Sequence, residues 1–246
     1  MTIPWLALSN DNQFPPLEHA LDDGLLAAGG DLSANRILNA YRHGIFPWFN
    51  EDDPILWWSP DPRMVLFTDK IKLSKSLKKT LRTSKLTITL DHAFKRVMIA
   101  CSQPRSGLNT DPNNTTWIHP DMVDAYVKLH HQGNAHSVEC WQGDELVGGL
   151  YGVAIGQMFF GESMFSSVRD SSKIALVALC QQLDRWGFPL IDCQVYSEHL
   201  ASLGAEEIDR NEFISYIDKL CLQRTPAQHW HLDSDLPISS GISSHG

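Results

Sequence analysis

The segment SVECWQGDELVGGLYGVAIGQMFFGES, residues 137–163, decides the fold of this 246-residue chain. It holds three apolar stretches, SVECW, ELVGGLYGVA and QMFFGES, which follow one another through short turns that contain glycine. Short apolar stretches separated by turn residues are typical of strands that pair with their neighbours in sequence. The segment therefore predicts a β-meander of three strands.

Helix and strand patterns surround this meander on both sides. Apolar residues recur at helical spacing over 71–81, 91–101, 120–133, 170–187 and 212–221, and strand patterns cover 86–90 and 188–195. With a further strand that begins at residue 63, the order is β-α-β-α, then the meander, then α-β-α. This order predicts an α/β (α+β) domain whose mixed sheet is flanked by helices on both faces.

Residues 1–62 differ from the rest of the chain because they are rich in Pro, Trp and Gly and contain one clear helix. Asp31 or Ser33 caps the start of that helix, and Gly44 ends it. The prolines at positions 47, 54, 60 and 62 exclude a helix after it and favour a rigid extended segment. We therefore expect a small N-terminal domain over 1–62, a second domain over 63–232, and a disordered tail over 233–246.

The composition is that of an ordinary globular protein, with 43% apolar and 20% charged residues. No apolar run approaches the ~18–20 residues that a membrane span needs, and the N-terminus lacks the apolar core of a signal peptide. Five cysteines without a CxxC pair indicate reduced thiols rather than disulfides or a zinc site. We expect a cytoplasmic monomer that acts away from membranes and binds no metal.

Charge is distributed unevenly along the chain. The formal net charge is −9, yet the window from Asp69 to Arg96 holds nine Lys or Arg against two Asp, which makes this window +7 and the remainder −16. A basic stripe on an acidic body steers a polyanion to one place, whereas the alternative is a solvated helix face. The residues that we expect to contact a nucleic-acid backbone are Lys72, Lys75, Lys78, Lys79, Arg82 and Lys85.

The strand segment IDCQV carries two polar side chains in an otherwise apolar stretch. Strand alternation puts Asp192 and Gln194 on one face, and Ile191, Cys193 and Val195 on the other. A carboxylate and an amide on a core strand are costly unless they meet partners. Two interpretations stay open: a buried Asp bonded to a neighbouring loop, or a carboxylate that holds an incoming ammonium while the amide orients the second reactant.

The segment FFGESMF sets Glu162 among aromatic side chains and methionine. Burial there would raise the pKa of this carboxyl, whereas a strand-end glutamate could instead point to solvent. Leu150, Phe159 and Met164 could line an apolar pocket near it, or could belong to the ordinary core.

Trp48 and Trp117 lie on extended stretches flanked by Pro or Thr. Tryptophan beside irregular backbone can stack a nucleobase. The alternative is a small core in the N-terminal domain, which we favour for Trp57 and Trp58.

Taken together, these stretches resemble the bacterial leucyl/phenylalanyl-tRNA–protein transferase family, from about residue 24 to residue 216. The segments that carry the resemblance are LLAAGGDLSANRILNAYRHGIFPWF, DPILWWSPDPRMVL, TWIHPDMVDAYVKLH, AHSVECW, ELVGGLYGV, FFGESMF, SSKIALVAL, LIDCQV and HLASLGA. The resemblance implies a small N-terminal domain followed by an acetyltransferase-like (GNAT) domain.

It also implies an activity: transfer of Leu or Phe, with Met as a further candidate, from aminoacyl-tRNA to the N-terminal Arg or Lys of a protein, which marks that protein for degradation. Neither a metal nor coenzyme A is implied. The positions that correspond to the family's functional residues are Asp192, Gln194 and Glu162 for catalysis, Trp48, Trp117, Tyr41 and Tyr126 for the terminal adenosine, and Leu150, Phe159 and Met164 for the aminoacyl pocket.

The chain departs from the family pattern in a few places. Ser167 stands where the family usually has Arg, and Arg169 could substitute for it. The loop over 104–115 is longer than usual, and Leu150 occupies a position where Met can occur.

Two other functions stay open on the sequence. An acyl-CoA-dependent N-acetyltransferase would need a glycine-rich turn at a helix start, and SSVRDSSK has no glycine. A non-catalytic RNA-binding module would need the basic stripe but not Asp192, Gln194 or Glu162.

Overall fold

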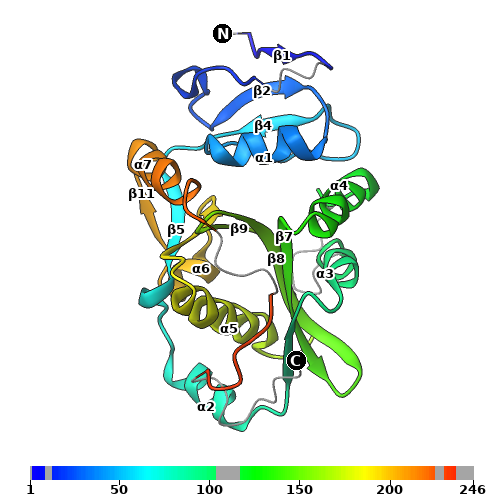
Figure 1. The fold of residues 1–246 in the computed structure, drawn as a ribbon, viewed down its shortest axis with the longest axis vertical. Coiled ribbons are helices and arrows are strands. Elements are labelled where there is room, and N and C mark those ends of the chain that lie inside the picture. The colour runs from blue at the N-terminus through cyan, green and yellow to red at the C-terminus, as the bar shows by residue number, and fades with distance from the viewer. Residues whose placement is uncertain (1, 9–12, 104–116, 225–229, 237–246) are drawn as a thin grey trace.

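The computed structural model describes residues 2–8, 13–103, 117–224 and 230–236 (Figure 1). Two sheets organise them. A four-stranded sheet near the N-terminus has the order β1-β2-β4-β3, and a seven-stranded sheet has the order β11-β5-β10-β9-β8-β7-β6. In Figure 1 the smaller sheet, with its helix α1, lies across one end of the larger one.

The elements follow one another along the chain in two groups. The first comprises β1 (Trp5–Leu6), a 3-10 turn (Leu17–His19), β2 (Leu25–Gly29), α1 (Ala34–Arg42), β3 (Phe46–Pro47) and β4 (Leu56–Trp58). The second comprises β5 (Arg63–Phe67), a 3-10 turn (Thr68–Lys70), α2 (Lys75–Thr83), β6 (Thr87–Leu90), α3 (Phe94–Cys101), α4 (Pro120–His131), β7 (Ala135–Gln142), β8 (Glu145–Ile155), β9 (Met158–Ser166), α5 (Ser171–Arg185), β10 (Leu190–Gln194), α6 (Glu198–Ser202), β11 (Glu206–Ile208) and α7 (Arg210–Leu220). The first sheet ends at Trp58 and the second begins at Arg63; a domain boundary near Pro62 remains a proposal.

The predicted β-meander is confirmed, since β7, β8 and β9 pair antiparallel in sequence order. The sheet is mixed because β10 runs parallel to β9 and antiparallel to β5. The parallel pairing ends at Asp192 and Phe160, while β9 continues to Ser166 along β8 alone. The two parallel strands therefore separate beyond this point.

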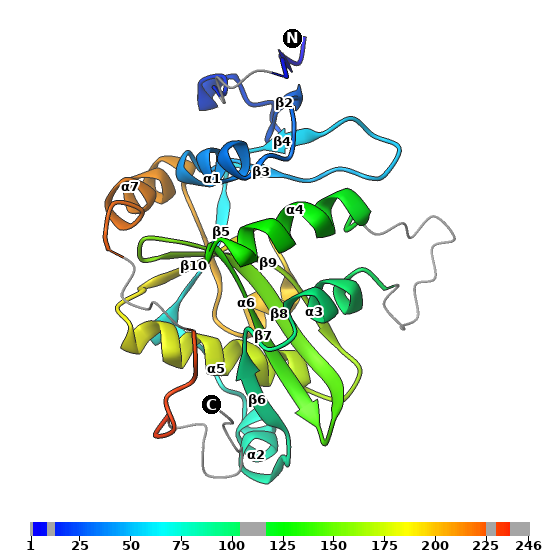
Figure 2. The ribbon, with the colours of Figure 1, turned by 45° about the vertical axis from the view of Figure 1, so that its right-hand side comes forward.

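Helices cover both faces of the large sheet, as the sequence predicts (Figure 2). The helix α5 packs on one face, against a core that includes Leu150, Phe159 and Ile191. The helices α1, α3 and α4 pack on the other face, against a second core that includes Tyr151 and Phe160. We call these the α5 face and the α4 face. Which face a strand residue occupies decides whether it can belong to the candidate site.

The N-terminal group forms its own small core around a tryptophan. Trp57 is fully buried and its Nε1 donates a hydrogen bond to the Gly29 carbonyl at 2.9 Å. The helix α1 begins as predicted, because Ser33 Oγ accepts a hydrogen bond from the backbone N–H of Arg36. Gly44 follows the helix with φ of 73°, a conformation that suits glycine.

The chain after Leu232 differs from the disordered tail expected from residue 233 onward. Asp233 accepts hydrogen bonds from Arg185 and Gln182 of α5, and Leu236 is only 3% exposed. An ion pair and a buried leucine thus hold residues 233–236 against the helix. Residues 237–246 and the long loop over 104–115 lie outside the described residues.

The five cysteines are free thiols. Burial raises the pKa of Cys140 to about 12, so this thiol stays protonated at neutral pH. Within the described part of the chain, no helix is both long enough and apolar enough to cross a bilayer.

Candidate active site

A buried ion pair lies at the point where β9 and β10 separate. Asp192 and Arg63 are both 0% exposed. Arg63 Nε donates to Asp192 Oδ1 at 2.8 Å, and Arg63 Nη2 donates to Asp192 Oδ2 at 2.7 Å. The guanidinium therefore binds the carboxylate through both of its oxygens.

This pair matches neither of the two interpretations of Asp192. Strand alternation does put Asp192 on the α4 face, opposite Ile191 and Cys193. Its partner, however, is neither a loop nor an incoming ammonium but an arginine on the adjacent strand β5. In this structure the carboxylate has no exposed oxygen with which to hold a substrate amine.

Arg63 is a buried partner of the candidate site that the sequence reasoning missed. It opens the apolar strand RMVLF, and a charged side chain there requires a buried partner. That signal was present in the sequence, although nothing local identified Asp192 as the partner.

Gln194 has an unusual backbone. The pairing of β10 with β5 shifts register between Asp192 and Gln194, and Gln194 has φ of 58°, in the left-handed region. Its backbone N–H donates to Asp192 Oδ1 at 2.9 Å. The side chain is 9% exposed, and its Nε2 has no hydrogen-bond partner among the described residues. The simple alternation assumed for IDCQV thus fails at Gln194, and the amide is left to pair with something else.

Glu162 also lies at a strand irregularity. Tyr151 pairs with Ser163 and Gly152 pairs with Gly161, so Glu162 is the extra residue of a β-bulge in β9. Its Oε1 accepts from Tyr41 at 2.5 Å, and its Oε2 accepts from Tyr126 at 3.1 Å. A bulge beside an active site is a common way to aim one side chain.

The pKa of Glu162 is raised to about 7, mainly because the carboxyl is buried. The nearby charge of Asp192 adds to this rise, while the two tyrosine hydrogen bonds and the charge of Arg63 oppose it. The sequence predicted a raised pKa from burial alone. A carboxyl of this kind can bind or release a proton near neutral pH.

Tyr41 of α1 and Tyr126 of α4 contact each other and the carboxyl of Glu162 through their hydroxyl groups. Their hydroxyl oxygens are 2.5 Å apart, and both side chains are fully buried. Burial raises both tyrosine pKa values well above their usual value, so both remain protonated donors. The resemblance assigned them to the terminal adenosine, whereas here they bind Glu162 and present no ring face to solvent.

The two tryptophans assigned to the adenosine are more accessible. Trp48 is 42% exposed and lies 5.6 Å from the ring of Trp58, whose Nε1 donates to the Trp48 carbonyl. Trp117 is half-buried and lies just before α4, packed against the core of the α4 face. Both tryptophans belong to segments without regular secondary structure. Stacking of a nucleobase on their rings remains a prediction.

The apolar residues assigned to an aminoacyl pocket lie on the α5 face. Leu150 and Phe159 are almost fully buried in that core, while Met164, paired with Leu150 across the strands, is partly exposed. Glu162 binds tyrosines on the opposite face. The structure therefore favours the core interpretation for Leu150 and Phe159, because strand alternation turns them away from Glu162.

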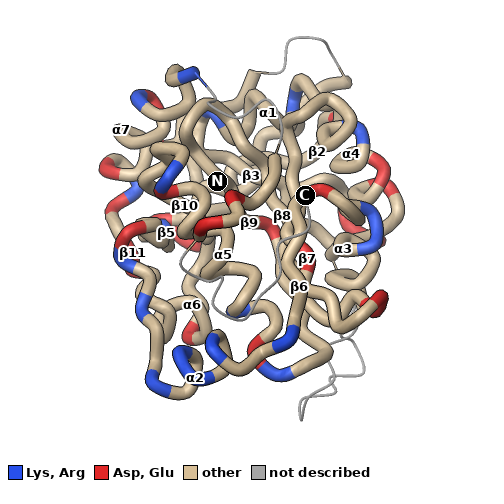
Figure 3. Tube along the Cα trace, turned by 60° about the horizontal axis from the view of Figure 1, so that its bottom comes forward, with Lys and Arg blue, Asp and Glu red and all other residues tan. Residues whose placement is uncertain are grey.

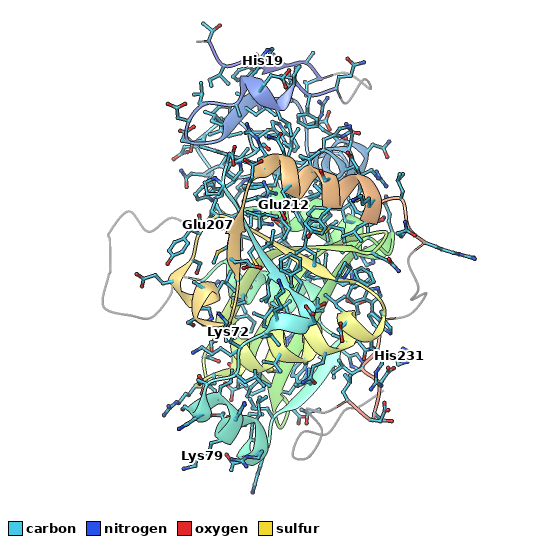
Figure 4. The ribbon with its side chains drawn as sticks, turned by 90° about the vertical axis from the view of Figure 1, so that its left-hand side faces the viewer. His19, Lys72, Lys79, Glu207, Glu212 and His231 are labelled. Atoms are coloured by element: carbon cyan, nitrogen blue, oxygen red, sulfur yellow. The ribbon has the colours of Figure 1, made fainter. Side chains whose placement is uncertain are left out.

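The six basic residues assigned to the nucleic-acid backbone are all exposed, on α2 or beside it. The opposite side of α2 is buried through Leu77 and Leu81. Figure 3 shows this concentration of Lys and Arg along α2, and in Figure 4 Lys79 lies at the end of the molecule opposite His19, with Lys72 in the same half of the molecule. We call Lys72, Lys75, Lys78, Lys79, Arg82 and Lys85 the α2 basic surface.

Arg169 lies beside this surface and not at Glu162. Its Nη2 donates to Ser76 Oγ of α2 at 3.3 Å. Ser167 donates its hydroxyl to the Val147 carbonyl and so stabilises the turn before α5. The Nε of Arg169 also lies 3.6 Å from Asp170 Oδ2, so Arg169 borders the α2 basic surface as part of an ion pair, and the described contacts do not link it to Glu162 or Asp192.

A mixed sheet flanked by helices, with a carboxyl–tyrosine network where its parallel strands separate, is the architecture of an α/β enzyme. Comparison with known proteins gives the family. The sequence profile of the leucyl/phenylalanyl-tRNA protein transferase family matches residues 65–218, and the profile of its N-terminal domain matches residues 30–61. The chain belongs to the leucyl/phenylalanyl-tRNA–protein transferase family.

Individual relatives agree with this assignment. The leucyl/phenylalanyl-tRNA–protein transferase of Nitrosomonas eutropha is 56% identical, over 94% of this chain and 97% of the relative. That of Chromohalobacter salexigens is 51% identical, over 99% of this chain and 94% of the relative. A solved GCN5-related N-acetyltransferase from Kribbella flavida aligns over 72% of this chain and 61% of that chain, with a TM-score of 0.34 and 10% identity.

Proposed function

We propose that this enzyme transfers Leu or Phe, with Met as a further candidate, from aminoacyl-tRNA to the N-terminal Arg or Lys of an acceptor protein. The product is a new peptide bond and an N-terminus that marks the acceptor for degradation. Family membership supports the donor and the acceptor class. The observation that carries the proposal is Glu162, held at a bulge by Tyr41 and Tyr126 on the sheet that also carries Gln194, whose buried Nε2 has no hydrogen-bond partner among the described residues.

The reaction needs placement more than activation. The acceptor amine nitrogen attacks the carbonyl carbon of the aminoacyl ester, a C–N bond forms, and the C–O bond to the terminal ribose breaks. The amine loses one proton and the ribose oxygen gains one. Because an α-amine has a pKa of ~7.7–8.0, a fraction of it is already neutral at pH 7. Holding the amine and the ester carbon together then provides most of the rate.

The side chains of the site suit these needs. An ionised Glu162 attracts a substrate ammonium, and that positive charge in turn favours the ionised carboxylate. The Nε2 donor of Gln194, which has no partner in the described protein, suits the oxygen that becomes negative as the amine attacks. Trp48 and Trp117 would stack the terminal adenosine, and the α2 basic surface would contact tRNA phosphates.

The test is a transfer assay with radiolabelled Leu-tRNA and two matched peptides, one that begins with Arg and one that begins with Asp. We expect label on the Arg peptide alone, and no label after RNase treatment of the donor. A parallel reaction with labelled acetyl-CoA should leave both peptides unlabelled. Labelling from acetyl-CoA, or no transfer from Leu-tRNA, would contradict the proposal.

A further inference from the structure

We propose that Arg63 is a positioning residue that acts through Asp192 to hold the side-chain amide of Gln194 toward the substrate. The inference rests on the proposed transfer reaction and deepens it. In this proposal Asp192 is neither a general base nor a ligand of the substrate ammonium. Its carboxylate instead connects Arg63 to Gln194.

The guanidinium of Arg63 has little freedom to move. In addition to its two bonds to Asp192, its Nη1 donates to the Gly44 carbonyl at 3.1 Å. Its Cζ lies 4.8 Å from the ring centroid of Phe46 and 4.6 Å from that of Phe213. These contacts come from the N-terminal group and from α7. Together with Asp192 of β10, they fix the orientation of the guanidinium and its forked pair of N–H donors. A guanidinium held in this way presents a rigid pair of donors, which a lysine ammonium does not.

Asp192 transmits that position to Gln194. The same oxygen, Asp192 Oδ1, accepts from Arg63 Nε and from the backbone N–H of Gln194. A left-handed backbone is unfavourable for a residue with a Cβ, and a hydrogen bond to a side chain two residues earlier is a common way to hold it. If Asp192 moved, Gln194 would relax toward the extended conformation of a strand, and its side chain would turn to another direction.

Gln194 has the properties of a group kept for a ligand. Its Nε2 is buried and has no hydrogen-bond partner in the described protein, although leaving a buried donor unsatisfied destabilises the folded state. Buried donors without a partner are rare in folded proteins, and those that occur are often found where a ligand binds. An oxygen of the substrate would satisfy it, provided that the backbone of Gln194 stays where Asp192 holds it.

Arg63→Lys tests the proposal, because it keeps the charge but loses the fork. We expect kcat for transfer to an Arg-starting peptide to fall by about 10- to 100-fold, while KM for Leu-tRNA stays within about twofold. Gln194→Ala should also lower kcat for transfer to the same peptide. The double variant Arg63→Lys/Gln194→Ala should be no slower than Gln194→Ala alone, because both changes remove one function.

A purely structural ion pair gives a different pattern. It would lower the melting temperature and leave the kcat of the folded fraction unchanged, or it would slow the reaction independently of Gln194, so that the two losses multiply. Either result overturns the proposal. Arg210→Lys is the matched control, since Arg210 Nη1 donates to the Ser59 carbonyl at 2.7 Å in the same region without reaching Asp192. Its kcat should equal that of the wild-type enzyme.

If Arg63→Lys does not fold, Asp192→Asn carries the same test. The asparagine oxygen still accepts from Gln194, but the charge that orients Arg63 is gone. A fall in kcat that disappears in the Gln194→Ala background supports the proposal, and multiplied losses overturn it. Failure of the proposed function is seen separately, because the wild-type enzyme would then transfer nothing from Leu-tRNA.

Discussion

The protonation of a single carboxyl, that of Glu162, links stability to chemistry in this enzyme. Its pKa in the folded protein is about 7, against an ordinary value of 4.5. Between these values the folded state keeps a proton that the unfolded state has lost. The free energy of unfolding therefore falls as pH rises through this window.

The variant Glu162→Gln should remove that pH dependence. From pH 5 to pH 8 the wild-type protein should lose up to about 3 kcal/mol of stability relative to the variant, which keeps an uncharged side chain at both pH values. Urea unfolding of both proteins at both pH values measures the difference. An equal change in the two proteins would mean that Glu162 does not titrate in this window.

Gln194 allows backbone strain to be separated from function. Glycine adopts a left-handed backbone without the ~1 kcal/mol cost that a Cβ brings. Relief of this strain should by itself make Gln194→Gly more stable than Gln194→Ala by about 1 kcal/mol. The greater conformational freedom of glycine in the unfolded chain opposes this gain, so the net difference should be smaller than about 1 kcal/mol and of the same sign. Both variants should lose most transfer activity because both lose the amide. Denaturant unfolding, together with the peptide transfer assay, tests both expectations, and an active glycine variant would contradict the role of the amide.

At the scale of elements, two irregularities create the site from ordinary strands. The bulge in β9 aims Glu162 at α1 and α4, and the register shift in β10 turns Gln194. Next to the bulge, Gly152 packs so closely that a Cβ on it would lie 2.3 Å from the Phe160 carbonyl oxygen. Its partner Gly161 is less crowded, with the nearest atom to such a Cβ at 3.4 Å.

These two glycines form a matched pair for mutation. Gly152→Ala should destabilise the protein by about 1–3 kcal/mol, since backbone would have to move to relieve the clash. Gly161→Ala should change stability by less than about 1 kcal/mol. Thermal or urea unfolding of both variants gives the comparison. Equal losses would show that the close approach at Gly152 is not what holds the bulge.

At the scale of the whole molecule, the basic and catalytic features are far apart. The α2 basic surface lies at the end of the molecule opposite the N-terminal sheet, whereas Glu162 binds α1 and α4 near that sheet (Figures 1 and 4). A long polyanion such as tRNA can bridge this distance, but an aminoacyl-adenosine fragment cannot. Binding through phosphates and chemistry at the ester are therefore separable.

Replacing Lys75, Lys78, Lys79 and Arg82 with Gln should weaken tRNA binding and reduce its salt dependence in proportion to the number of phosphates that no longer meet a cation. Transfer from a minimal aminoacyl-adenosine donor should keep its wild-type rate. Binding titrations at several salt concentrations measure the first effect, and the peptide assay measures the second. The exposed pair Lys128 and Lys219, changed to Gln, serves as a control. An unchanged salt slope would make the α2 basic surface a solvated helix face.

Local patterns were enough to predict most of the scaffold. The meander over 137–163, the cap of α1 at Ser33 and the amphipathic α2 with Leu77 and Leu81 inward all follow from periodicity and capping, which depend on residues a few positions apart. The short elements α6 and β11 escaped prediction because a few residues show no periodicity. The residue patterns of IDCQV and FFGESMF, together with the resemblance, singled out Asp192, Gln194 and Glu162.

The sequence by itself therefore determined the order of the longer elements in the large sheet, the face of the strand residues that alternate regularly, and the polar character of Asp192 and Gln194 in a core strand. Only the tertiary structure decided the pairs themselves. Arg63 and Asp192 are 129 residues apart, and Tyr41 and Glu162 are 121 apart. Register shifts in β9 and β10 decide which side-chain atoms meet. The register of each strand depends on how the whole sheet packs between its helices, and no local sequence pattern encodes that packing.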